Sequence, residues 1–338
     1  MAIISIRHAT SVAVADVEAE LRKLDSPAKS AARNLLIVLG SLIAFALLQA
    51  FSTTPTGIAV LIVVLLIHEL GHLLAMKLFG YRDVQMFFIP MFGAAVSGSE
   101  TSPNGTKRAV VALLGPAPGI ALGIACAVLF HSTGNPVFMQ AARTFLILNT
   151  FNLLPFAPLD GGHYMEAVLF SRTPMLRALF DIGAGLGLAG LAIALRSGLL
   201  GLLAFVVFVS VRSRYFSSRL AGQIKDELAA HDANEQSSEA SNFVRERIPS
   251  EYVERLTPML ENRLPEAART PARIAKEMRG VWNMVWFKPP SIAVSVGLVF
   301  LYLASFGIGL LATVGAEVSF LPPSSQPDAA LHVDAAPQ

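Results

Sequence analysis

Residues 56–79 read TGIAVLIVVLLIHELGHLLAMKLF, an apolar run that contains two histidines and one glutamate. About 20 helical residues cross a hydrocarbon core of about 30 Å, so this run predicts a transmembrane helix. Ionisable side chains at membrane depth are costly and need a partner. We therefore interpret His68, Glu69 and His72 as parts of a functional site. The alternative is a set of polar hydrogen bonds between helices.

The pattern H-E-x-x-H at 68–72 is typical of helices that bind a metal ion. Its spacing places His68 and His72 on one face of the helix, one turn apart, with Glu69 at a neighbouring position. A catalytic zinc site normally takes three protein ligands and leaves a fourth position for water. A third ligand must therefore come from elsewhere in the chain.

The strongest candidate for the third ligand is Asp160, in the segment NLLPFAPLDGGH at residues 152–163. Its carboxylate follows a helix that Pro155 and Pro158 are expected to break, and it precedes a pair of glycines. Such unwound backbone is tolerated at membrane depth only where it is buried in protein or lines a wet cavity. Asp160 can reach the histidines only if the chain bends near the prolines or if the fourth transmembrane helix begins well outside the membrane. The alternative is a helix-ending turn with a solvated aspartate.

The composition of the 338 residues is that of a membrane protein. Hydrophobic residues make up 54% of the chain and charged residues 15%, against roughly 25% charged residues in a globular domain. The predicted fold class is therefore an all-α polytopic membrane protein. The formal net charge of +2 offers no basic surface for nucleic acid, and the single cysteine, Cys126, excludes a disulfide framework and a cysteine zinc cluster.

Hydropathy predicts about seven transmembrane helices. Residues 84–98 are too short and too interrupted, by Pro90 and Gly93, to be one of them. The lysines and arginines of the short loops fall on one side if every helix crosses, with Arg196 as the one exception, and that side is predicted to be cytoplasmic. The seven helices are expected at 34–51, 56–79, 109–130, 137–155, 175–195, 198–211 and 291–314.

Charge is spread unevenly along the chain, and nearly half of it lies in residues 213–288. These residues are predicted to form a helical cytoplasmic insert. Within it, Thr270 followed by Pro271 predicts the start of a helix, on which Trp282 and Trp286 are expected to anchor at the membrane interface. The predicted segments are a cytoplasmic N-terminal segment at 1–33, a transmembrane domain at 34–212, the insert at 213–288, a last transmembrane helix at 289–314 and a disordered tail at 315–338.

The motifs HELGH at 68–72 and NLLPFAPLDG at 152–161 together resemble the site-2 protease family of intramembrane zinc metalloproteases. The resemblance covers about residues 56–170, which would form the metalloprotease core. It implies one zinc ion per chain, held by His68, His72 and Asp160, with Glu69 as the catalytic base. It also implies that Asn152 positions the substrate or stabilises the oxyanion, and that residues 84–98 form a short re-entrant β-loop whose edge can pair with an unwound substrate.

One stretch departs from the pattern of this family. Residues 115–119 read GPAPG and resemble a G-P-x-x-N stretch, but Gly119 stands where asparagine is usual. The expected role of this stretch is close helix packing.

The expected function is proteolysis within the membrane, by zinc-activated water with Glu69 as general base. The expected partners are the lipid bilayer and a membrane-anchored protein substrate with a transmembrane helix; no nucleic acid is expected. One alternative is a zinc-binding membrane protein without peptidase activity, such as a transporter or an inactive scaffold. Another is a membrane metalloprotease that takes its third ligand from a downstream glutamate, for which Glu166 is the nearest candidate. Glu69 favours the enzyme, since transport or structural binding needs no general base beside the first ligand.

The expected location is the bacterial inner membrane. The N-terminus and the 213–288 insert are expected in the cytoplasm, and the active site is expected toward the cytoplasmic side.

Overall fold

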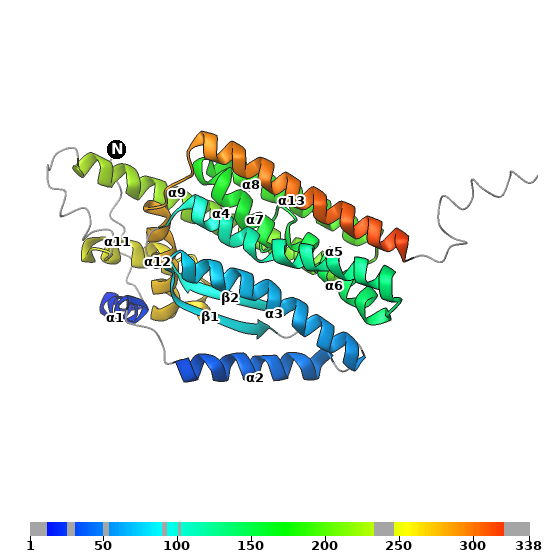
Figure 1. Cartoon of the computed structure of the whole chain (residues 1–338). Coiled ribbons are helices and arrows are strands. Elements are labelled where there is room, and N and C mark those ends of the chain that lie inside the picture. The colour runs from blue at the N-terminus through cyan, green and yellow to red at the C-terminus, as the bar shows by residue number, and fades with distance from the viewer. Residues whose placement is uncertain are drawn as a thin grey trace, which may run out of the picture. The chain divides into compact units, whose positions relative to one another are not determined.

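The computed structural model describes residues 12–25, 31–49, 54–89, 93–100, 103–232 and 247–320. The chain is mostly helical, as predicted (Figure 1). Among these residues, five helical segments are long and apolar enough to cross a membrane, so the protein is an integral membrane protein. They are Pro55–Leu78, Gly105–Thr133, Met175–Ala194, Gly198–Ala230 and Ile292–Ser319. A total of seven crossings remains a prediction.

The chain forms two compact units. The unit that carries the H-E-x-x-H motif contains a bundle of helices and one β-hairpin. Its elements are α2 (Ala31–Gln49), α3 (Pro55–Leu78), β1 (Arg82–Ile89), β2 (Gly93–Ser99), α4 (Gly105–Leu114), α5 (Pro116–Thr133), α6 (Pro136–Asn152), α7 (Asp160–Val168), the 3-10 turn η1 (Phe170–Arg172) and α13 (Ile292–Ser319). Helix α13 extends to Ser319, so the tail that was expected from residue 315 is helical at its start; residues 321–338 lie outside the described residues.

Local sequence explains where the helices around the motif begin. Thr54 caps α3, because its hydroxyl accepts a hydrogen bond from the N–H of Gly57 and Pro55 fills the first helical position. The helix predicted at 109–130 begins earlier and consists of α4 and α5, which meet at Gly115 and Pro116. Proline has no N–H to continue the ladder of α4, so a new helix starts there.

Helix α6 ends at Asn152, three residues before the predicted end at Pro155. Residues 153–159 then form an irregular turn, and α7 starts at Asp160. The turn can pack closely on α7 because the second and third residues of this helix are glycines. A Cβ on Gly161 would lie 2.2 Å from the backbone of Leu153, and a Cβ on Gly162 would lie 2.2 Å from the backbone of Phe156. The bend expected near the prolines is therefore present, and it places Asp160 at the start of a new helix.

The predicted β-loop is an antiparallel hairpin of β1 and β2, with Phe88 opposite Ala94 and Met86 opposite Val96. Helix α2 packs along β1, and the N–H of Phe88 donates a hydrogen bond to the hydroxyl of Ser41 on α2. Phe88 and Met86 are buried in a small apolar cluster with residues of α2 and α3. One edge of the hairpin is thus covered by α2, while a re-entrant position in the membrane remains a prediction.

The second unit contains α1 (Val14–Asp25), α8 (Pro174–Ala194), α9 (Gly198–Asp232), α11 (Ser250–Glu261), the 3-10 turn η2 (Glu266–Ala268) and α12 (Pro271–Val285). Helices α8 and α9 form a hairpin. The far end of α9 packs with α1, α11 and α12 around a core that includes Val17, Ile224, Leu256 and Met278. Helix α9 passes residue 212 without a break, and the domain boundaries stay predictions.

Helix α12 begins as predicted, since the hydroxyl of Thr270 accepts a hydrogen bond from the N–H of Arg273 and Pro271 follows. The interfacial role expected for Trp282 is wrong. Its side chain is only 1% exposed and packs in the core of this unit, beside Tyr252 and Trp286. The helix buries its tryptophan face against α1, α9 and α11 because that is the apolar face of an amphipathic helix.

The burial of Trp282 can be measured by fluorescence, because the chain has only two tryptophans. We expect a Trp286→Phe variant, in vesicles of brominated lipid, to show little quenching, since protein side chains surround Trp282. A tryptophan introduced by Phe300→Trp in a chain without the two native tryptophans is the control, because Phe300 is 69% exposed on an apolar helix. Quenching of Trp282 as strong as that of the control would show that it contacts lipid.

Candidate metal centre

The centre is built on α3, where His68 and His72 lie one helical turn apart. Both side chains are buried, and their Nε2 atoms face each other at 3.2 Å. The two rings meet edge to face, with centroids 4.9 Å apart. The spacing of four residues therefore brings both imidazoles to one point, as the sequence predicts.

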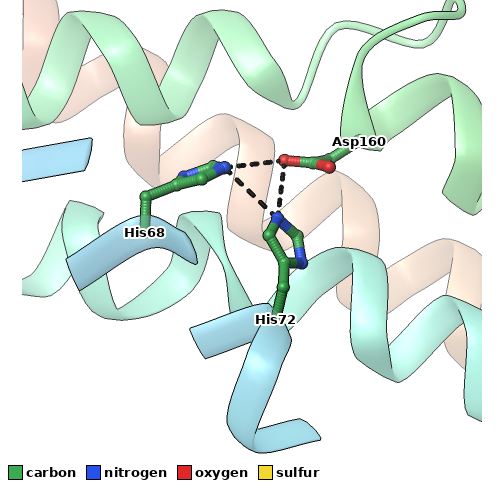
Figure 2. A group of neighbouring side chains, drawn as sticks. All are labelled: His68, His72 and Asp160. Atoms are coloured by element: carbon green, nitrogen blue, oxygen red, sulfur yellow. Dashed lines mark hydrogen bonds and ion pairs between the residues drawn. The ribbon is translucent and has the colours of Figure 1, made fainter. Parts of the chain in front are cut away.

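Asp160 completes the group from the start of α7 (Figure 2). Its Oδ2 atom lies 3.1 Å from Nε2 of His68 and 3.3 Å from Nε2 of His72. The three side chains come from positions 92 residues apart in the chain (160 minus 68) and converge because α6 ends early and the following turn reverses direction. Among the described residues, the ligand atoms of these three side chains lie close enough together to hold one metal ion.

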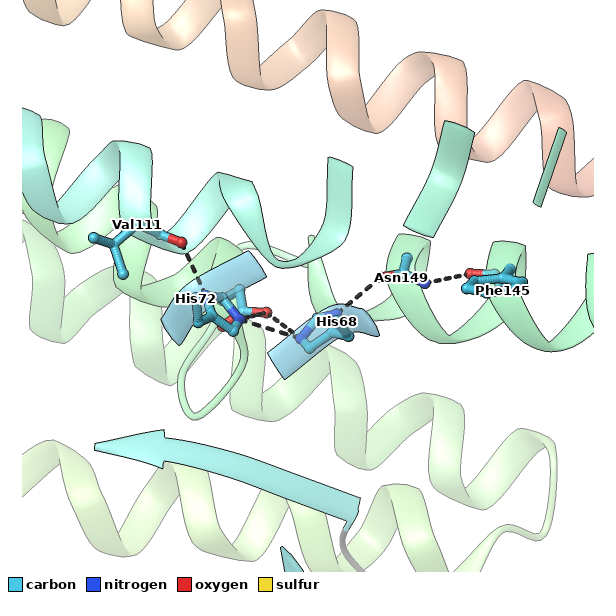
Figure 3. A network of polar contacts seen from close by, with 6 residues as sticks. His68, His72, Val111, Phe145 and Asn149 are labelled. Atoms are coloured by element: carbon cyan, nitrogen blue, oxygen red, sulfur yellow. Dashed lines mark hydrogen bonds and ion pairs between the residues drawn. The ribbon is translucent and has the colours of Figure 1, made fainter. Parts of the chain in front are cut away.

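Hydrogen bonds behind the two rings determine where their protons lie (Figure 3). The amide of Asn149 donates through Nδ2 to the carbonyl of Phe145 at 2.7 Å, so its Oδ1 faces His68. Oδ1 can only accept, so Nδ1 of His68, at 2.8 Å, carries the proton. Nδ1 of His72 likewise donates to the carbonyl of Val111 at 2.9 Å. Each ring therefore presents an Nε2 lone pair to the centre.

Three lone pairs thus point at one small volume, and such a group needs a cation. Oδ2 of Asp160 is a buried atom without a hydrogen-bond partner among the described residues. Ligands about 2.0–2.1 Å from a tetrahedral zinc ion lie roughly 3.3–3.4 Å from one another, and the observed separations are 3.1 to 3.3 Å. Two imidazoles and a carboxylate are also a donor set that suits zinc. The residues present fit a zinc ion.

Glu69 lies beside the centre without joining it. It follows His68 directly on α3, is only 5% exposed, and interacts electrostatically with both histidines and Asp160. The backbone of Val96 in β2 lies beside its carboxylate. A buried carboxylate therefore lies between the three converging side chains and the hairpin, where it can exchange a proton with a group bound at the centre.

The structure gives Asn152 no position among these contacts: it is the last residue of α6, and its role remains a prediction. The asparagine that contacts the centre is Asn149, one turn earlier, which sequence reasoning missed. A polar residue within an apolar run was the available signal. The hydrogen bond between His72 and the carbonyl of Val111 could not be predicted from the sequence, because every residue has a backbone carbonyl.

Gly115 explains how the ring of His72 fits beside α4 and α5. A Cβ at this position would lie 2.2 Å from Nε2 of His72, so any side chain would occupy the space of the ring. This agrees with the close packing expected for residues 115–119, and it makes the α4–α5 junction one wall of the centre.

Comparisons with known proteins find similarity to zinc metalloproteases. Residues 56–145 match the model of peptidase family M50. The chain is 28% identical over 156 residues to the zinc metalloprotease MJ0392 of Methanocaldococcus jannaschii, a match that covers 45% of each protein. It is 34% identical over 161 residues to Rip3 of Mycobacterium tuberculosis, whose name describes a zinc metalloprotease; this match covers 44% of the chain and 39% of the relative. The matched segments therefore span less than half the length of these curated relatives.

A solved structure of the site-2 protease from Methanocaldococcus jannaschii is also similar, with 18% identity and a TM-score of 0.38; the match covers 52% of this chain and 87% of that one. The M50 match contains both histidines and Glu69 and ends before Asp160. The place of Asp160 in the centre is therefore supported by the distances alone.

The contribution of Asp160 can be tested by metal binding. We expect Asp160→Asn to weaken zinc binding by at least about tenfold, because a neutral amide replaces the only charged donor. Affinity is measured by competition with a chelator on the purified full chain in detergent. Glu166→Gln is the matched control, since it makes the same chemical change on the same helix. Equal affinity of Asp160→Asn and wild type would remove Asp160 from the centre.

Proposed function

We propose that this protein, whose residues 56–145 match the model of peptidase family M50, is an intramembrane zinc metalloprotease that cleaves transmembrane segments of membrane-anchored proteins. The observation that carries the proposal is the convergence of three lone-pair donors, from His68, His72 and Asp160, beside the buried carboxylate of Glu69. Curated relatives named zinc metalloproteases support it.

His68, His72 and Asp160 would hold one zinc ion per chain. Zinc at such a site lowers the pKa of a water and polarises a carbonyl oxygen, which is the chemistry that peptide hydrolysis needs. The protein supplies the orientation of the ligands. Asn149 and Val111 hold the two rings from behind, so both Nε2 atoms are directed before any ion binds.

Glu69 would act as the general base and then as the general acid. Glu69 directly follows His68 on α3, so its side chain points about 100° away from that of His68 around the helix axis. It therefore lies at the border of the centre and is not one of the three ligands. From there it would take a proton from the attacking water and pass it to the leaving amine nitrogen. Asn152 would position the substrate or stabilise the oxyanion, as the resemblance implies.

A zinc-binding transporter or inactive scaffold is the less favoured alternative. A transported ion must leave its site, and a structural ion needs a closed fourth position. Neither function explains a buried carboxylate directly beside the ligands. The M50 match over the helix that carries Glu69 also favours hydrolysis.

The β2 edge of the hairpin, with which no further strand pairs among the described residues, offers a way to hold an unwound substrate. The N–H of Phe88 points away from β2, toward α2. Backbone groups alternate in direction along a strand, and Phe88 is opposite Ala94, so the groups of Ala94 and Val96 point away from β1. Val96 faces Glu69 on that edge. A substrate strand that pairs with β2 would therefore run past the catalytic base.

The positive-inside pattern of the loops supports a cytoplasmic N-terminus, a cytoplasmic 213–288 segment and a site that opens toward the cytoplasm of a bacterial inner membrane. Such a site receives water from the cytoplasm, and its substrate from the bilayer.

The role of Glu69 separates proteolysis from zinc binding. We expect Glu69→Gln to abolish cleavage of a co-expressed single-span reporter, because the amide cannot take a proton from water, while about one zinc per chain remains bound. Cleavage is followed by immunoblotting and zinc by elemental analysis of the purified protein. Glu166→Gln, on α7, is the control and should cleave normally. Undiminished cleavage by Glu69→Gln would exclude Glu69 as the base.

Pairing with β2 can be tested at Ala94. We expect Ala94→Pro to slow cleavage strongly and to leave zinc binding unchanged, because proline removes one outward N–H from the free edge and none from the β1–β2 ladder. Ala94→Val is the matched control, since valine keeps the N–H and favours a strand. Equal cleavage rates for the proline and valine variants would exclude pairing through this part of β2.

A further inference from the structure

A glycine on α5 and an asparagine on α6 share one site behind His68. Gly119 is buried, and a Cβ built on it would lie 2.2 to 2.4 Å from Nδ2, Cγ and Oδ1 of Asn149. The two helices pack along each other. The side-chain amide of Asn149 thus occupies the position where the side chain of residue 119 would otherwise begin.

This amide has a defined direction. Asn149 is fully buried, and the carbonyl of Phe145 holds its Nδ2. Oδ1 is thereby turned toward Nδ1 of His68, which it contacts at 2.8 Å. A hydrocarbon side chain would fill the same volume but would leave Nδ1 of His68 without an acceptor.

We propose that Asn149 is the positioning residue of His68, and that Gly119 provides the space that admits its amide. Asn149 would fix the proton on Nδ1 and the plane of the ring, so that the Nε2 lone pair stays directed at Asp160 and His72. This proposal rests on the proposed function, because it assigns a purpose to the orientation of a zinc ligand.

The pair also accounts for the departure at position 119. Residues 115–119 resemble a G-P-x-x-N stretch, in which asparagine is usual where Gly119 stands. In this chain an amide reaches the same space from α6. The space between the helices holds a single amide. Only one of the two helices can supply it, because side chains at positions 119 and 149 cannot both fit there.

Zinc affinity of the purified full chain, measured by competition with a chelator, tests the proposal without any assay of cleavage. We expect Asn149→Leu, which branches at the same atom and lacks the acceptor, to bind zinc about 10- to 100-fold more weakly. Asn149→Asp keeps the acceptor and should bind far more tightly than Asn149→Leu. Leu146→Ala is the control for packing damage, because Leu146 is buried on the same helix and packs on Gly123.

A second measurement moves the amide from position 149 on α6 to position 119 on α5. Gly119→Asn alone should weaken zinc binding, because its side chain collides with Asn149. The double variant Gly119→Asn and Asn149→Ala should bind more tightly than either single variant, since one amide again fills the space. Such non-additivity is expected only for residues that share a contact.

The outcomes are distinguishable. A wild-type chain that binds no zinc contradicts the proposed function itself. If wild type binds zinc and Asn149→Leu binds it equally well, or Leu146→Ala weakens binding as much, Asn149 has no positioning role. A double variant that binds no better than Asn149→Ala would overturn the exchange between positions 119 and 149.

Discussion

The convergence of two imidazole nitrogens and one carboxylate oxygen, at 3.1 to 3.3 Å from one another, is the constraint on which the arrangement of this unit depends. Three lone-pair atoms at such distances repel in a medium of low dielectric constant unless a cation lies among them. Each donor is therefore held by a separate part of the chain. Asn149 holds His68, the carbonyl of Val111 holds His72, and the close turn before α7 places Asp160.

The position of Asp160 requires α6 to end inside the protein, and the backbone freed there must be satisfied. An unpaired buried backbone group costs roughly 1–3 kcal/mol. The hydroxyl of Tyr302 on α13 donates to the carbonyl of Leu153, and a second tyrosine, Tyr164 on α7, donates to the carbonyl of Leu298 at 2.7 Å. Helix α13 follows in sequence long after the motif, yet it stabilises the turn that presents Asp160.

Much of this centre could be predicted from sequence because its signals are local or chemical. The spacing of His68 and His72 fixes their common face, and Asp160 stands out as a carboxylate between a proline-broken helix and two glycines. The Thr270 cap is also a local signal, and it is confirmed.

The features that sequence reasoning missed are set by partners distant in the chain. The burial of Trp282 depends on a core formed with α1, α9 and α11, and hydropathy does not distinguish such an apolar face from one that faces lipid. The choice of Asn149 over Asn152 depends on the rotation of α6 against α3 and on the space above Gly119. A single sequence contains neither the rotation nor the space.

In the proposed function, the β-hairpin would connect the supply of water with the binding of substrate. Its β1 edge is covered by α2, whereas the β2 edge carries the Val96 backbone that contacts Glu69. Unpaired strand groups cannot face hydrocarbon, so the β2 edge must meet water, protein or another strand. Hydrolysis of a transmembrane segment needs both water and a substrate strand at the same place. Water makes the attack, and the strand is an extended peptide whose carbonyls are no longer bonded within a helix. Because Glu69 lies beside this edge, the residue that would activate water is where an unwound substrate would arrive.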